Sequence, residues 1–190
     1  MTVGCVVLAA GGGSRFAAGG GGAHKLVTPF RGRPLVQWAV EAAISSGVGP
    51  VAVVEGAVPM GHLVAGDVVV LSNPSWASGQ ASSLGVAVAW ARTLELSAVV
   101  VGLGDQPLVP ASAWRAVAGA GPTPPVAVAT YDGRRGNPVR LDASVWDRLS
   151  FSGDEGAREL MRREPEVWGA VACEGNPADV DTVEDLAQWS

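Results

Sequence analysis

Short apolar segments alternate with helical segments along most of this sequence. Strands are predicted at residues 3–8, 51–54, 68–71, 98–103, 126–130, 139–141 and 169–173. Several of these segments lack the alternating polar residues of a strand that faces solvent on one side. Strands that are apolar on both faces lie inside an α/β sandwich, with helices on each side. The pattern therefore predicts an α/β fold.

Helices are predicted between the strands, at residues 34–46, 80–96, 110–118, 154–163 and 183–189. The chain has 190 residues, which is a usual size for one domain, so a single domain over residues 1–190 is expected. In open α/β sheets, ligands bind at the carboxyl ends of the strands. The loops expected there span residues 9–25, 72–83, 104–107, 131–138 and 176–181.

The composition argues against several classes of protein. A formal net charge of -5 disfavours nucleic acid as a partner, because binding a phosphate backbone requires clustered Lys and Arg. The apolar runs are far shorter than the roughly 20 residues of a membrane helix, so no membrane partner is expected. With only Cys5 and Cys173, a disulfide framework is not expected, and two buried free thiols fit a cytoplasmic protein.

A glycine-rich loop follows the first predicted strand. Its residues are Leu8, Ala9, Ala10, Gly11, Gly12, Gly13 and Ser14. Small residues let backbone amides approach an anion closely, and the nearby Arg15 and Lys25 add positive charge. The loop is therefore predicted to hold phosphate groups.

The spacing in this loop argues against two other phosphate-binding motifs. A P-loop has Ser or Thr after its lysine, but Leu26 follows Lys25. A Rossmann loop has a third glycine where Phe16 stands, and it needs an acidic residue after the second strand, for which Glu55 is the candidate. The first match fails and the second is weak.

The same loop resembles the signature of a nucleotidyltransferase family. Residues 8–11 read Leu-Ala-Ala-Gly, residues 14–16 read Ser-Arg-Phe, and residues 24–26 read His-Lys-Leu. This pattern is similar to nucleotidyltransferases with a glycosyltransferase-A-like fold, in particular the MobA-like or MocA-like group that includes molybdenum cofactor cytidylyltransferase. A longer glycine insert at residues 19–22 departs from the pattern. The resemblance implies a three-layer α/β/α domain with a mostly parallel mixed sheet.

Three aspartates are implied as metal ligands by this resemblance. Asp105 lies in a Gly-Asp-Gln-Pro motif that follows the strongest predicted strand, where a carboxylate suits Mg²⁺ bound to substrate phosphates. Residues 179–186 resemble the family's Asp-x-Asp-Thr-x-x-Asp-Leu motif. In an extended backbone Asp179 and Asp181 would lie on one side, with Asp181 the better candidate ligand.

Several polar residues near helix starts have two interpretations. The family's base-contacting loop corresponds to the segment that contains Asn73, Ser82 and Ser83, but Ser78 or Ser82 could instead be a plain helix N-cap. Thr182 could cap the last helix, with Asp185 at the capping-box position.

Two further segments resemble motifs that lie on the acceptor side of the site in this family. Gly136 and Asn137 resemble its Gly-x-Pro stretch, and Asp154 lies in a segment similar to its Gly-Asp-x-Gly-Ala-Arg motif. Taken alone, Asp154 is a candidate helix N-cap.

The resemblance implies transfer of a nucleoside monophosphate from a nucleoside triphosphate (NTP) to a small phosphate-bearing acceptor, with release of pyrophosphate. Lys25, Arg15 and Asp105 would be catalytic, and Mg²⁺ the cofactor. Leu-Ala-Ala-Gly is more like the cytidylyl branch, which favours CTP and molybdopterin, with a molybdoenzyme or chaperone as a further partner. Two alternatives stay open: an NAD(P)H-dependent oxidoreductase of the nicotine blue type, which also occurs among MocA-like proteins, and a non-catalytic nucleotide-binding protein.

Overall fold

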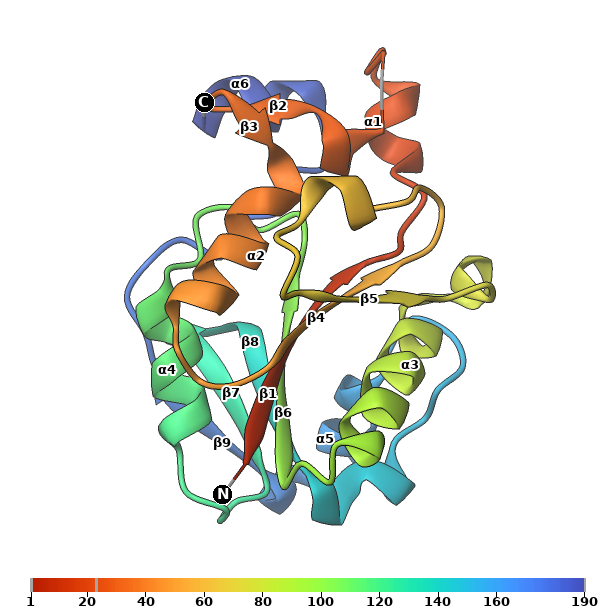
Figure 1. Cartoon of the computed structure of the whole chain (residues 1–190). Coiled ribbons are helices and arrows are strands. Elements are labelled where there is room, and N and C mark those ends of the chain that lie inside the picture. Colours follow the sequence, from red (N-terminus) through yellow and green to blue (C-terminus); the bar gives the residue numbers. More distant parts are fainter. Residues whose placement is uncertain (1, 23, 190) are drawn as a thin grey trace.

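The computed structural model describes residues 2–22 and 24–189. Within these residues seven strands form one sheet, in the order β5-β4-β1-β6-β8-β7-β9 (Figure 1). Its strands are β1 (Val3–Ala9), β4 (Val51–Glu55), β5 (Val69–Ser72), β6 (Ala98–Leu103), β7 (Val126–Tyr131), β8 (Arg134–Asp142) and β9 (Trp168–Ala172). A small second sheet pairs β2 (Pro29–Phe30) with β3 (Arg33–Pro34).

The large sheet is mostly parallel. Strand β1 is parallel to β4 and β6, β4 is parallel to β5, and β7 is parallel to β9. Only β8 among the described strands of this sheet runs against its neighbours, β6 and β7. The predicted mixed, mostly parallel sheet is confirmed.

The antiparallel strand corrects one sequence prediction, because residues 131–138 were expected to form a loop. Asp132 and Gly133 have positive φ angles of 49° and 78°, which suit a tight hairpin turn between twisted strands. Strand β8 therefore starts at Arg134, directly after the turn.

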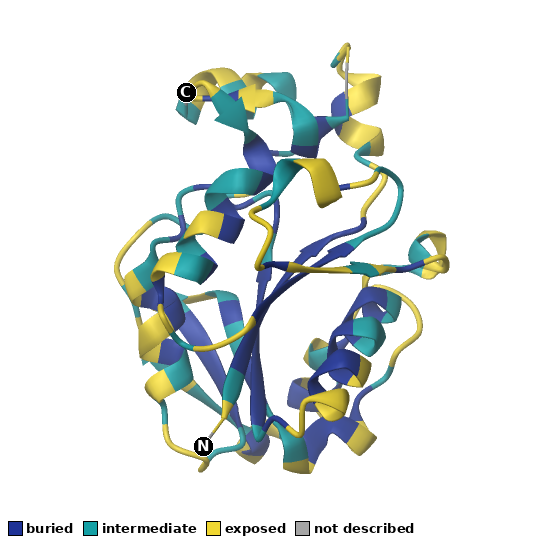
Figure 2. Cartoon of the chain, in the orientation of Figure 1, coloured by how far each residue is buried: buried dark blue, intermediate teal, exposed yellow. Residues whose placement is uncertain are grey.

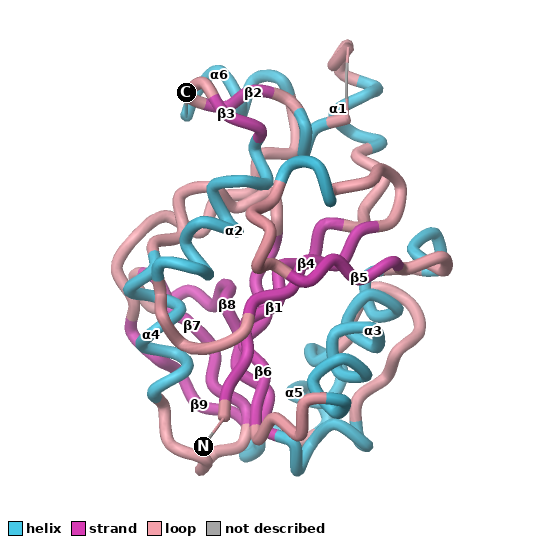
Figure 3. Tube along the Cα trace, viewed as in Figure 1, coloured by secondary structure: helices cyan, strands magenta, loops and turns pink. Residues whose placement is uncertain are grey.

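Helices cover both faces of the large sheet. The helices on the two faces are α2 (Leu35–Ser45), α3 (Gln80–Thr93), α4 (Ala111–Gly119) and α5 (Ala157–Arg163), whereas α1 (Ser14–Ala18) and α6 (Val183–Trp189) lie beyond one end of the strands (Figure 1). Apolar residues of α2 and α4 pack with one face of the sheet, and those of α3 and α5 pack with the other. Figure 3 shows the same three layers, and Figure 2 shows that the central strands are buried while the outer sides of the helices are exposed. The three-layer α/β/α fold is confirmed.

Two predicted helix boundaries are wrong. Helix α3 ends at Thr93 rather than at residue 96, because Glu95 has a φ of 52° and the chain then turns back. Leu96 and Trp90 instead fill the space beside Gly4, where a Cβ atom would lie 2.7 Å from the Leu96 side chain. Helix α5 begins at Ala157 rather than at residue 154. The short helix α1 was not predicted, and it lies inside the loop expected at residues 9–25.

Both cysteines are free thiols, as predicted, although only Cys5 is fully buried and Cys173 is half-buried. Burial raises the pKa of the Cys5 thiol to about 12, despite an opposing contact with Ser46, so this thiol is protonated at neutral pH. Among the residues that the structure describes, no helix has the length and apolar character to cross a membrane.

Candidate functional site

The site is built where two parallel strands end side by side. Leu8 of β1 pairs with Leu103 of β6, so the glycine-rich loop and the Gly-Asp-Gln-Pro motif leave the sheet together. The backbone N–H of Gly104 donates to the carbonyl of Leu8 at 2.9 Å. A Cβ atom at Gly104 would lie only 3.3 Å from the Leu8 oxygen and from the Ala9 Cβ atom. The glycine thus brings Asp105 close to the start of the loop.

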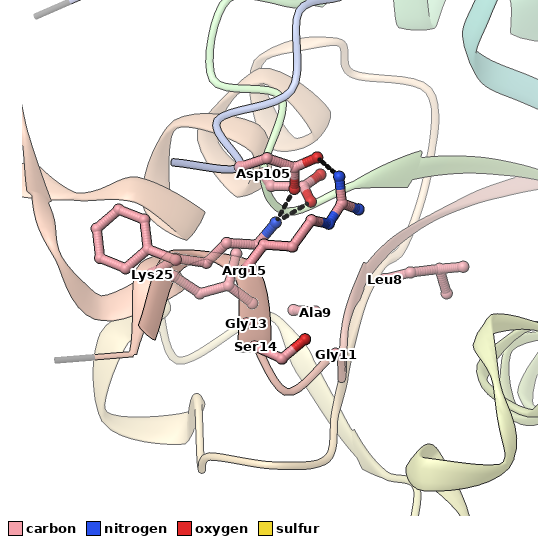
Figure 4. A pocket seen from close by; sticks show the side chains of 11 residues that line it. Leu8, Ala9, Gly11, Gly13, Ser14, Arg15, Lys25 and Asp105 are labelled. Carbon is pink, nitrogen blue, oxygen red and sulfur yellow. Dashed lines mark hydrogen bonds and ion pairs between the residues drawn. The ribbon is translucent and has the colours of Figure 1, made fainter. Parts of the chain in front are cut away.

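Four charged side chains meet at this point, and we call them the Lys25 cluster: Arg15, Lys25, Asp105 and Asp181. Lys25 Nζ donates to Asp105 Oδ2 at 2.7 Å and to Asp181 Oδ1 at 2.8 Å, while Arg15 Nη1 donates to Asp181 Oδ2 at 2.6 Å (Figure 4). The Lys25 side chain is 10% exposed, whereas that of Arg15 is 77% exposed. Burial alone would lower the pKa of Lys25, but Asp105 and Asp181 outweigh it and raise the pKa above its usual value. Lys25 is therefore charged at neutral pH.

The C-terminal segment is held against Asp105 by its backbone. Val180 N–H donates to the Asp105 carbonyl at 2.9 Å. The predicted capping box is confirmed: Asp185 N–H donates to Thr182 Oγ1 at 3.1 Å, and Asp185 Oδ2 accepts from the amides of Asp181 and Thr182 at 3.0 and 2.9 Å. These contacts fix the position of the Asp181 carboxylate.

The carboxylates near Lys25 fit a divalent cation. Asp105 Oδ1 is buried without a hydrogen-bond partner in the described structure, which is costly unless a ligand satisfies it. Asp179 is bound to Gln106, whose Nε2 donates to Asp179 Oδ1 at 2.7 Å; burial, and then the charge of Asp105, raise the Asp179 pKa. No three His, Cys, Asp or Glu side chains within residues 2–22 and 24–189 form a ready metal centre. Mg²⁺ nevertheless often takes only one or two carboxylates and completes its shell with phosphates and water.

The glycine-rich loop and the Lys25 cluster enclose a pocket of about 210 Å³. It is lined by Leu8, Ala9, Gly11, Gly13, Ser14, Arg15, Phe16, Lys25, Leu26, Asp105 and Asp181. Most predicted phosphate-binding residues are thus brought together (Figure 4). Ala10 is buried instead, and Gly12 lies under Trp76, whose ring would be 3.0 Å from a Cβ atom at Gly12.

His24 contacts the glycine-rich loop through its imidazole ring. Its Nδ1 accepts from the Leu26 amide at 3.4 Å, and Nε2 lies 2.8 Å from the Gly11 carbonyl oxygen. Because a carbonyl can only accept, Nε2 carries the proton in this arrangement. Burial lowers the pKa of His24, which keeps the ring neutral and the bond to Gly11 intact at neutral pH.

The glycine insert folds back over Phe16, which lines the first pocket. Gly21 N–H donates to the Phe16 carbonyl at 3.1 Å, and a Cβ atom at Gly21 would lie 2.3 Å from the Phe16 ring. A glycine is therefore required at this position if Phe16 is to remain in place. Ala23, which follows the insert, is outside the described residues.

The residues predicted to contact the base form hydrogen bonds with one another. Asn73 Nδ2 donates to Ser82 Oγ and Ser83 Oγ, both at 2.9 Å. These contacts tie the segment after β5 to the first turn of α3, and the three side chains line neither pocket described here. The serine N-cap prediction is wrong, because Gly79 is the N-cap of α3 and the Ser82 hydroxyl donates to the Gly79 carbonyl.

Asp154 does not cap its own helix as predicted, because Gly156 precedes α5. Its Oδ1 instead accepts from Gln80 N–H, at the start of α3, at 3.3 Å. The neighbouring Gly153 carbonyl accepts from Ala81 N–H at 2.9 Å. Gly79 makes this approach possible, since it has a φ of 113° and a Cβ atom there would lie 2.3 Å from the Gly153 oxygen. The segment before α5 is thus fastened to α3.

A second, larger pocket of about 700 Å³ lies beside the first. The three predicted acceptor residues all line it: Gly136, Asn137 and Asp154. Its floor is apolar and includes Val101, Val128, Val139 and Leu141. Leu8, near the end of β1, lines both pockets.

Three cations of the second pocket are not among the site residues predicted from the sequence: Arg135, Arg158 and Arg162. Arg162 pairs with Glu155, whereas the Arg135 guanidinium lies 5.0 Å from the centre of the Trp168 ring. The Asp-Gly pair at residues 132–133 was an available signal for the hairpin that carries Arg135. Arg158 is the last residue of the segment similar to the Gly-Asp-x-Gly-Ala-Arg motif, which was an available signal for it. No motif pointed to Trp168.

Comparison with known proteins places the chain among related sequences and structures. Residues 5–167 match the model of the MobA-like NTP transferase domain. Nicotine blue oxidoreductase from Paenarthrobacter nicotinovorans is 32% identical over 196 residues, which span 95% of this chain and 93% of that protein.

Two solved structures share the fold over nearly the whole chain. Rv0371c from Mycobacterium tuberculosis H37Rv has a TM-score of 0.82 at 27% identity, covering 99% of this chain and 97% of that one. The same protein is also known in a complex with manganese. A nucleotidyl transferase from Methanothermobacter has a TM-score of 0.83 at 23% identity, covering 98% of this chain and 95% of that one, and this likeness concerns the fold alone.

Proposed function

The chain belongs to the MobA-like NTP transferase family, and on this basis we propose that it moves CMP from CTP to the phosphate of molybdopterin, releasing pyrophosphate. The proposal is supported most by two pockets that share the lining residue Leu8, with the Lys25 cluster in the smaller one. A donor phosphate in one pocket and an acceptor in the other would be adjacent. Such positioning supplies much of the rate enhancement when two substrates must meet.

The proposed transfer forms one bond and breaks one bond. An oxygen of the acceptor phosphate attacks the α-phosphorus of CTP, and the bond from that phosphorus to the oxygen bridging to the β-phosphorus breaks. The bonding electron pair leaves with pyrophosphate. Reactions of this kind depend mainly on alignment and on neutralisation of charge, so the protein needs no covalent nucleophile.

The residues of the first pocket have matching roles in this proposal. Lys25 and Arg15 balance the negative charge of the triphosphate, and the amides of residues 11–14 hold its β- and γ-phosphates. Asp105 and Asp181 hold Mg²⁺, with Asp179 beside them, and the unpartnered Asp105 Oδ1 supports this assignment. When bound, Mg²⁺ supplies positive charge that stabilises the charge shifting onto the leaving pyrophosphate. Asn73, Ser82 and Ser83 shape the loop proposed to face the base.

The second pocket suits an acceptor with an apolar body and an anionic group. Within the described residues Arg135 and Arg158 form no ion pair with an acidic side chain, whereas Arg162 is already paired with Glu155. We therefore assign the acceptor phosphate to Arg135 and Arg158. Gly136 and Asn137 lie beside them, and Asp154 holds the wall formed by the start of α3.

The proposal extends to the cellular setting. Two free thiols suit a reducing cytoplasm, where we place the protein. The proposed product, molybdopterin that carries CMP, would pass to a molybdoenzyme or its chaperone.

A second candidate function is favoured by one observation, the 32% identity to nicotine blue oxidoreductase. In that case the first pocket would take the pyrophosphate of a dinucleotide. The cluster of Lys25 with Asp105 and Asp181 argues for the transferase, since hydride transfer needs no pair of metal-binding carboxylates. NAD(P)H-dependent bleaching of a dye would favour the oxidoreductase.

We expect CTP with Mg²⁺ to raise the melting temperature more than ATP, GTP or UTP with Mg²⁺. At a CTP concentration of 100 times its Kd, binding to the folded state adds about 2.7 kcal/mol. For a domain of this size that gain corresponds to a shift of about 5–10 °C. A thermal-shift screen of the four NTPs, with Mg²⁺ or with EDTA, measures it. NTP binding is contradicted if none of the four shifts the melting temperature.

A further inference from the structure

We propose that Lys25 is a placeholder cation in the nucleotide-free protein. Its ammonium group binds the two carboxylates proposed to hold the metal, and it binds the phosphates instead when a triphosphate enters the first pocket. Tight metal binding therefore depends on the nucleotide. The inference rests on the proposed function for the identity of the anion. It concerns the order in which the site fills, which the proposed transfer leaves open.

The geometry of the cluster carries this inference. Asp105 and Asp181 have four carboxylate oxygens between them, and in the described structure three are already bound to cations. Lys25 Nζ holds Asp105 Oδ2 and Asp181 Oδ1, at 2.7 and 2.8 Å, and Arg15 holds Asp181 Oδ2 at 2.6 Å. Asp105 Oδ1 alone is unpartnered. A single ammonium group therefore bridges the two carboxylates at the place where a divalent ion would sit.

Lys25 cannot leave the carboxylates without cost. Its side chain is 10% exposed, and a buried charge without a partner is strongly unfavourable. The first pocket offers no replacement, since the described residues that line it include no acid other than Asp105 and Asp181. A divalent ion that bound alone would also repel the ammonium group beside it. Both effects weaken the binding of metal to the free protein.

A triphosphate in the first pocket removes this cost. The pocket lies next to Lys25 and is lined by the glycine-rich loop, so the phosphates give the ammonium group a new partner. Lys25 then releases oxygens of both aspartates, and the ion and the nucleotide strengthen each other's binding. By linkage, each ligand raises the affinity for the other by the same factor.

Arg92 provides a control, because its side chain is 49% exposed, pairs with the exposed Asp147 and lines neither pocket. Water and salt already screen an exposed charge, so its loss changes the site little. Lys25→Met removes the buried bridging charge, Arg92→Met removes an exposed charge outside the site, and Lys25→Arg keeps a positive charge near the carboxylates.

Titration of Mn²⁺ into the nucleotide-free protein, followed by the electron paramagnetic resonance signal of free Mn²⁺, tests the placeholder. We expect the Kd for Mn²⁺ to fall at least about tenfold in Lys25→Met, within the usual range of coupling between ligands. The Kd should stay within about threefold of the wild-type value in Arg92→Met and Lys25→Arg, because an exposed or a retained charge alters the site little. Unchanged or weaker Mn²⁺ binding by folded Lys25→Met overturns the inference.

A measurement on the unaltered protein covers the case in which Lys25→Met does not fold. Mn²⁺ alone should shift its melting temperature far less than Mn²⁺ with CTP. An equally large shift with Mn²⁺ alone overturns the inference. The proposed function fails separately, by absence of pyrophosphate release in the unaltered protein, and this outcome leaves the comparison of Mn²⁺ affinities intact.

Discussion

Replacing Asp105 with asparagine is expected to lower metal-dependent pyrophosphate release by about 10²–10³-fold, the loss typical when one charge-stabilising group is removed from an active site. The amide keeps the size of the side chain but loses the negative charge that Lys25 and the proposed Mg²⁺ share. The backbone carbonyl of Asp105, which accepts from Val180, is unaffected. The measurement is the rate of pyrophosphate release at saturating CTP and acceptor.

The control for Asp105→Asn is the same substitution at a surface ion pair. The Asp147 side chain is 88% exposed, pairs with Arg92 and lines neither pocket. Asp147→Asn should leave the rate unchanged, because exposed ion pairs contribute little. A full rate in Asp105→Asn would remove Asp105 from the catalytic site.

Replacing Trp114 with alanine is expected to lower the free energy of unfolding by about 3–5 kcal/mol, the usual cost of emptying a buried aromatic position. Trp114 is 1% exposed and lies on α4 over β6. Its ring fills the space beside Gly102, where a Cβ atom would lie only 2.4 Å from Trp114 Cζ2. Urea unfolding followed by far-ultraviolet circular dichroism measures the change.

An exposed apolar residue is the control for Trp114→Ala. Leu94 is 46% exposed, so Leu94→Ala should change the free energy of unfolding by less than about 0.5 kcal/mol. A loss below about 1 kcal/mol in Trp114→Ala would contradict the packing described here, because it is far less than the cost of a large cavity. Because Trp114 supports the strand that ends at the Gly-Asp-Gln-Pro motif, activity should fall with the folded fraction.

The sheet was predictable from sequence because its central strands are apolar on both faces. The segments predicted at residues 3–8 and 98–103 correspond to β1 and β6 and differ from them by at most one residue. The hairpin of β7 and β8 was missed, because polar residues such as Arg134 and Arg135 hide the start of β8. The turn chemistry of residues 132–133 decides that element, and hydrophobic periodicity does not detect it.

The order of the motifs predicted which residues form the Lys25 cluster, but it did not predict the contacts between their side chains. Lys25 is separated from Asp105 by 80 positions and from Asp181 by 156, so only the fold shows that one ammonium group bridges them. The prediction that Asp154 caps its own helix was wrong for the same reason, since the residue that it contacts, Gln80, is 74 positions away. Local rules assign a cap to the nearest helix and cannot identify one supplied from elsewhere in the fold.

The proposed cytidylyl transfer can be measured as pyrophosphate release from the purified protein with CTP, molybdopterin and Mg²⁺. Pyrophosphate should appear only when all three are present, in a one-to-one ratio with a product that joins CMP to the acceptor phosphate. The contrary result is that no pyrophosphate forms with any of the four NTPs, while NAD(P)H is consumed in the presence of a reducible dye.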